Sequence, residues 1–128
     1  MTDTRQLNRW MRHDPTYLGA FPLNVLPSTS SGHCCFIVNT HPANLSGQHW
    51  IAVRIRERVA WIFDPLSYPP LAELCEHLLQ RLNCSALHFC KTPAQPAFSQ
   101  TCGQHCVYFL RTGNAAPSET VLLHSVYK

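Results

Sequence analysis

Two strand-like segments, residues 48–55 and 58–63, follow each other with only a short link around Glu57, and this constrains the fold most. A link of this length allows only a hairpin, so the two segments are expected to pair as antiparallel strands. A third apolar segment of strand type, residues 34–38, precedes them. The three segments together predict an antiparallel sheet.

Helical periodicity is visible in three other segments, residues 3–13, 70–82 and 102–111. The middle segment has the clearest pattern, because apolar residues recur there every three or four positions, at Leu71, Leu74, Leu78 and Leu82. Two more strands are predicted, at residues 85–89 and 120–124. The chain is therefore expected to be an α+β protein with a small, mostly antiparallel sheet packed with helices.

Length and composition predict one soluble, globular unit. A chain of 128 residues suits a single compact domain spanning residues 1–128. Hydrophobic residues make up 45% and charged residues 13%, which excludes a disordered chain. We find no apolar run long enough for a membrane span and no signal-like N-terminus, so a soluble intracellular protein is expected.

Cysteine content and net charge add two further expectations. Seven cysteines without a secretory signal favour reduced thiols over a disulfide framework. A net charge of +3 permits weak attraction to a polyanion but does not indicate it.

Four side chains, in a fixed order along the chain, match the requirements of a cysteine peptidase. A thiol nucleophile needs a base, an acceptor that orients the base, and a donor for the oxyanion. Cys102, His49, Asp64 and Gln95 can fill these roles in that order. Placing Cys102 in the first turn of a helix favours its thiolate, because unpaired backbone N–H groups and the helix dipole stabilise a negative charge there. Gly103 leaves room for a substrate backbone.

The same residues resemble a known family, the adenovirus-type maturation proteases (adenain), which are distantly similar to SUMO-specific peptidases. The resemblance runs from about Tyr17 to Leu110. It is carried by an ordered set of short segments: residues 17–19, 36–40, 47–50, 63–65 and 95–103, with Cys106 and residues 109–110.

This resemblance implies an adenain-like, papain-type core and a role for each site residue. His49 is then the general base, Asp64 the third triad member, Cys102 the nucleophile and Gln95 the side-chain oxyanion donor. Two departures stand out. Adenoviral enzymes usually have Glu where this chain has Asp64, and adenain continues for many residues beyond its catalytic helix.

The resemblance also implies partners. It predicts a thiol endopeptidase that cleaves viral or virus-like precursor or capsid proteins at Gly-containing sites, in the host cell nucleus or the virion. The sequence itself requires no cofactor. By resemblance, an activating peptide would form a disulfide with Cys84, and DNA would act as a second cofactor.

Several alternatives remain open at this stage. The relatives allow a peptidase that processes SUMO or ubiquitin-like proteins, and a catalytically silent structural domain is a third possibility. Cys102, His105 and Cys106 are possible zinc ligands, although no second ligand pair matches them. Most other cysteines are expected to be small core residues. The alternating Arg54, Arg56 and Arg58 are expected on the solvent face of a strand, with a nucleic-acid contact as the other interpretation.

Overall fold

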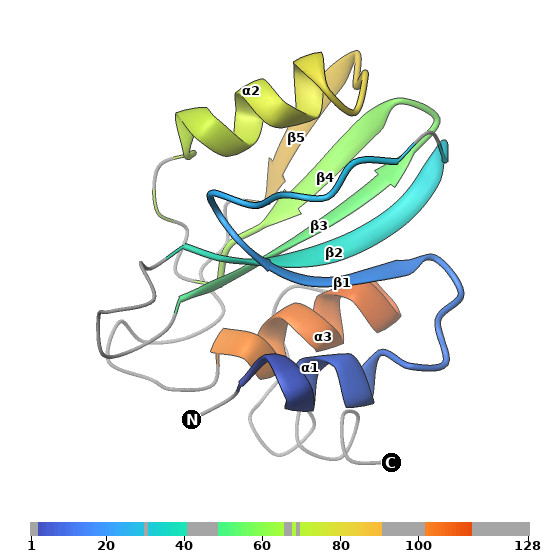
Figure 1. Cartoon of the computed structure of the whole chain (residues 1–128), viewed down its shortest axis with the longest axis vertical. Helices are drawn as coiled ribbons and strands as arrows, with labels where there is room; N and C mark the ends of the chain where they lie inside the picture. Colours follow the sequence, from blue (N-terminus) through green and yellow to red (C-terminus); the bar gives the residue numbers. More distant parts are fainter. Residues whose placement is uncertain are drawn as a thin grey trace.

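The computed structural model describes residues 3–29, 31–40, 49–65, 68, 70–90 and 102–113. Three helices and five strands follow one another in the order α1 (Thr4–Trp10), β1 (Tyr17–Pro22), β2 (His33–Asn39), β3 (Trp50–Arg56), β4 (Val59–Phe63), α2 (Ala72–Gln80), β5 (Ala86–Cys90) and α3 (Cys102–Thr112). Helix α2 covers one face of the sheet, and α1 and α3 lie against the other (Figure 1). The α+β class is confirmed.

The sheet has the order β1-β2-β3-β4-β5 and is mixed. Strands β2, β3 and β4 pair antiparallel, as the sequence predicts, whereas β1 pairs with β2 and β5 with β4 in parallel. The prediction of a mostly antiparallel sheet therefore holds only for its centre. A parallel pair needs a crossover connection, and α2 provides it between β4 and β5.

Strand β1 was not predicted, because its short sequence lacks the usual signals of a strand. Gly19 lies in its interior with a φ of 139°, and the register with β2 shifts between Tyr17 and Ala20. Glycine weakens a strand pattern and often marks such an irregularity. Its neighbour β2 supplies the pairing that holds this segment extended.

The predicted hairpin between β3 and β4 is confirmed. Arg56 pairs with Val59, so Glu57 and Arg58 alone form the loop. Both loop residues have positive φ, 49° and 67°, as a tight turn that follows the twist of the strands requires.

Helices α1 and α2 are slightly shorter than the sequence predicts, and α3 is one residue longer. A capping box between Asp3 and Gln6 starts α1, which ends at Trp10 rather than near residue 13. Helix α2 begins two residues after Pro70. The strand predicted at residues 120–124 lies outside the described residues. None of the helices in the described ranges is long and apolar enough to cross a bilayer.

Strand β2 is buried on both faces of the sheet, and the alternation of its side chains divides the core into two clusters. Cys35 and Ile37 face α1 and α3, whereas Phe36 and Val38 face α2. A strand buried on both sides reads as a continuous apolar run, which explains why residues 34–38 lack an alternating pattern.

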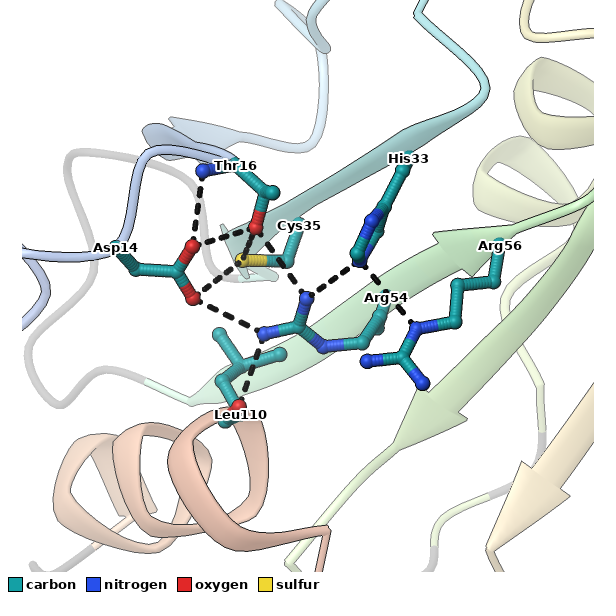
Figure 2. A network of polar contacts seen from close by, with 7 residues as sticks. All are labelled: Asp14, Thr16, His33, Cys35, Arg54, Arg56 and Leu110. Carbon is teal, nitrogen blue, oxygen red and sulfur yellow. Dashed lines mark hydrogen bonds and ion pairs between the residues drawn. The ribbon is translucent and has the colours of Figure 1, made fainter.

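Arg54 connects three parts of the fold (Figure 2). Its guanidinium donates to Asp14 Oδ2 at 3.1 Å and to the Leu110 carbonyl at 2.9 Å. Only 15% of this side chain is exposed. The expectation of a solvent-facing Arg54 is therefore wrong. The tertiary structure brings a carboxylate and the last turn of α3 to this point of β3, and both satisfy the charge.

Two adjacent leucines on α2 allow a matched test of this packing. Leu78 is 0% exposed and Leu79 is 44% exposed. We expect Leu78→Ala to lower the free energy of unfolding by about 2–5 kcal/mol, because it leaves a cavity in the core. Leu79→Ala should change it by less than about 1 kcal/mol. Urea denaturation measures both, and equal losses would contradict the assignment of α2 to the core.

Candidate active site

The sheet topology brings His49 and Asp64 together. His49 directly precedes β3, and Asp64 directly follows β4. Because β3 and β4 are antiparallel neighbours, the start of β3 and the end of β4 lie side by side at the same end of the strands. Helix α3 packs under this sheet and begins at Cys102, so its first residue arrives beside the other two.

Cys102, His49 and Asp64 form a continuous chain of contacts. The His49 Nδ1 atom lies 3.2 Å from Cys102 Sγ, and its Nε2 atom lies 2.7 Å from Asp64 Oδ1. All three residues are buried. The carboxylate can therefore fix the orientation and tautomer of the imidazole while the other ring nitrogen serves the thiol.

The Cys102 thiol is also held by the backbone of Trp50. The Trp50 N–H donates to Cys102 Sγ at 3.2 Å, and Cys102 Sγ donates to the Trp50 carbonyl at 3.1 Å. The Thr40 N–H bonds to the His49 carbonyl, so the polar groups of Trp50 point away from β2. The β3–β4 register ends at the pair Ala52 and Phe63, before Trp50 is reached. The thiol thus takes the place of a strand partner.

These contacts shift two pKa values in opposite directions. The pKa of Cys102 is lowered to about 6, by a hydrogen bond from Cys106 and, against the effect of burial, by the bond and charge of His49. Burial disfavours the charged form of His49, but Asp64 and Cys102 outweigh it and raise the His49 pKa to about 9. Between about pH 6 and pH 9 the proton therefore lies on His49, and the pair is a thiolate and an imidazolium.

The remaining cysteines lack this activation. Burial raises the pKa of each of them: Cys34, Cys35, Cys75, Cys84, Cys90 and Cys106. Cys84 is only 5% exposed and packs in the cluster under α2, on the sheet face opposite the catalytic helix. An incoming peptide would therefore need Cys84 to become exposed, and the disulfide expected there stays a prediction.

Gln95 lies outside the described residues, so its predicted role as an oxyanion donor stays a prediction. Sequence reasoning did not single out Tyr68, whose ring lies 5.2 Å from the His49 ring, centroid to centroid. This position carries no distinctive sequence signal. Cys106, named from the sequence only within the family resemblance and as a possible zinc ligand or core residue, lies one helical turn after Cys102. Within the part of the chain that the structure describes, no three His, Cys, Asp or Glu side chains are grouped to hold a metal ion.

The lowered pKa gives a prediction that needs no substrate. We expect iodoacetamide at neutral pH to alkylate Cys102 faster than the other six cysteines, with a rate that halves near pH 6 as the thiolate takes up a proton. Mass spectrometry of peptides from the labelled protein measures each site. Uniform labelling, or a Cys102 midpoint near pH 9, would contradict the ion pair.

Comparison with known proteins gives a sequence relative and structural neighbours. No family model matches the chain. The chain is 31% identical over 113 residues to a protein named "Protease" from Porcine adenovirus A serotype 3, with 75% of this chain and 55% of that protein covered. It thus spans about half the length of this relative.

The structure is similar to the crystal structure of the ASFV pS273R protease, with a TM-score of 0.58 and 14% identity. The match covers 98% of this chain and 59% of that one, and at this identity it shows the fold alone. In sequence the chain is similar to an adenovirus protease, and in fold it is similar to a viral protease of ASFV.

Proposed function

We propose that the chain is a cysteine endopeptidase that works through an acyl-enzyme. The observation that carries this proposal is the contact of Cys102 with His49, which is itself held by Asp64. The adenovirus relative is named as a protease, which supports the same reaction class. From the family resemblance we propose viral precursor proteins with Gly-containing sites as substrates, and the host cell nucleus or the virion as the place of action.

Each step of the reaction uses a group at this site. The Cys102 thiolate attacks the scissile carbonyl, and backbone N–H groups at the start of α3 together with Gln95 stabilise the oxyanion. The His49 imidazolium then donates its proton to the leaving amine. His49, now neutral, takes a proton from the water that hydrolyses the thioester.

Two other functions fit parts of the same site. A peptidase for SUMO-like or ubiquitin-like proteins would use the same three residues, so cleavage of Gly-Gly-terminated fusions compared with capsid-type precursors separates the two substrate classes. A silent binding domain would not need an activated thiol. The lowered pKa of Cys102 favours an enzyme over that alternative.

A basic hollow at the other end of α3 supports a polyanionic cofactor, and we propose that it binds a nucleic acid. The hollow has a volume of about 1200 Å³. Its lining includes five arginines, Arg9, Arg12, Arg54, Arg56 and Arg111. The exposed Trp61 ring lies 4.4 Å from the His88 ring within the same lining, centroid to centroid. Arginines interleaved with exposed aromatic rings suit phosphates and stacked bases.

This basic hollow is physically connected to the nucleophile. Arg54 lines it and donates to the Leu110 carbonyl in the last turn of α3, while Cys102 lies in the first turn. A helix of 11 residues spans about 16 Å, so one rigid element joins the two places. We propose that a phosphate competing with Asp14 or Leu110 for Arg54 would alter how α3 is held.

The resemblance also suggests an activating peptide, and β5 offers a place for it. Strand β5 is at the edge of the sheet and pairs only with β4 within the described residues. An extended peptide can add to such an edge through backbone hydrogen bonds. Cys84 lies two residues before this strand, so a disulfide there would hold the added peptide in place if the thiol became exposed.

The protease proposal is tested with a panel of short Gly-containing peptides, incubated with and without DNA. We expect Cys102→Ala to abolish cleavage, because loss of the nucleophile removes the covalent route. The melting temperature should stay near that of the unchanged protein. Cys75→Ala, which removes a thiol on α2 far from the site, is the matched control and should cleave normally. Cleavage that survives in Cys102→Ala would remove the assignment.

The nucleic-acid proposal is tested by charge reversal in the hollow. We expect Arg12→Glu combined with Arg56→Glu to weaken binding of a short oligonucleotide. The negative slope of log K against log salt should become smaller in magnitude by about two, because two phosphate contacts are lost. The control pairs Arg81→Glu with Arg5→Glu, which makes the same change of charge at exposed arginines outside the hollow. Equal losses in both double variants would indicate non-specific attraction only.

A further inference from the structure

Cys106 shares a hydrogen-bond acceptor with the nucleophile. It follows Cys102 by four residues on α3, so the two side chains lie on the same face of the helix. Cys106 Sγ donates to the Trp50 carbonyl at 3.2 Å, and Cys102 Sγ donates to the same oxygen at 3.1 Å. Cys106 is 0% exposed, so no water competes for these contacts.

Ionisation of Cys102 removes one hydrogen-bond donor from the Trp50 carbonyl. When Cys102 passes its proton to His49, it stops donating to this oxygen, and a negative sulfur remains close to a carbonyl dipole of the same sign. A buried carbonyl that loses its donor destabilises the state in which this happens. The Cys106 thiol is the second donor already in contact with this oxygen.

The structure assigns Cys106 as a positioning residue for the nucleophile. Its protonated thiol has one proton to donate, either to the Trp50 carbonyl or to the Cys102 sulfur, and either bond favours the state in which the reactive thiolate forms inside a buried site. This inference rests on the proposed function, in which Cys102 is the attacking group.

The groups around Cys106 favour its protonated form. Burial raises the pKa of Cys106 well above its ordinary value, and the charges of Cys102 and Asp64 raise it further. Tyr17 on β1 also faces this thiol, and its own pKa is raised mainly by burial. The hydrogen bond from Cys106 is the largest effect that lowers the pKa of Cys102, ahead of His49. Cys106 therefore stays a donor while Cys102 ionises.

The experiment measures the pH dependence of Cys102 alkylation by iodoacetamide, with each cysteine resolved by mass spectrometry and no substrate present. Cys106→Ala removes the donor, and we expect it to raise the midpoint by about one pH unit. Cys106→Ser keeps a donor of similar size and should return the midpoint to within a few tenths of a unit. Cys75→Ala, on α2, is the matched control and should leave the midpoint unchanged.

The alanine variant leaves a small cavity, so circular dichroism first confirms its fold. Cys106→Val also removes the donor but fills more of the space, and it carries the same expectation if the alanine variant does not fold. An unchanged midpoint in a folded donor-free variant would overturn the proposal. So would a shift in Cys106→Ser as large as in Cys106→Ala, because only packing would then matter.

The same measurement separates this inference from the proposed function. If the wild-type protein cleaves no peptide but the variants show the expected midpoints, the protease proposal is contradicted and the role of Cys106 is supported. If the protein cleaves peptides and every variant has the same midpoint, the protease proposal is supported and the role of Cys106 is contradicted.

Discussion

The contact of Cys102 with the Trp50 backbone is the interaction on which the candidate site depends. Strand β3 continues beyond the end of its pairing with β4, so its first N–H and carbonyl need partners. The Cys102 sulfur at the start of α3 accepts from the N–H, and the Cys102 and Cys106 thiols both lie within donating distance of the carbonyl. One interaction therefore completes a strand, fixes the first turn of a helix and holds a nucleophile beside His49.

The rest of the fold keeps α3 in the position that this contact needs. Cys106 and Val107 bury the middle of the helix, and the stacked rings of Phe63 and Phe109, 4.8 Å apart, pack its last part against β4. At its far end, Arg54 from β3 holds the Leu110 carbonyl and pairs with Asp14. Helix α3 is thus attached to the sheet along its whole length, and the position of Cys102 follows from packing rather than from its own loop.

Sequence patterns predicted the parts of this fold that depend on local signals. The hairpin at Glu57, the leucine repeat of α2 and the helix beginning at Cys102 all appear in the structure. Strand β1 was missed and β5 was not expected to run parallel, because both features depend on a neighbouring strand. Arg54 was placed on the surface for a similar reason, since its carboxylate partner lies 40 residues away in the chain.

The sequence alone determined which residues are available for chemistry: a cysteine, a histidine and an aspartate in a fixed order, with the cysteine at the start of a helix. Residue types and local periodicity are properties of the chain itself, so they can be seen without a structure. Only the tertiary structure decided that His49 bridges Cys102 and Asp64, and that Cys106 shares the Trp50 carbonyl with the nucleophile. The contacts of Cys102 with His49 and of Cys106 with Trp50 join residues 53 and 56 positions apart. The pKa shifts that activate the thiol depend on burial and distance, which exist only once the sheet and α3 have packed together.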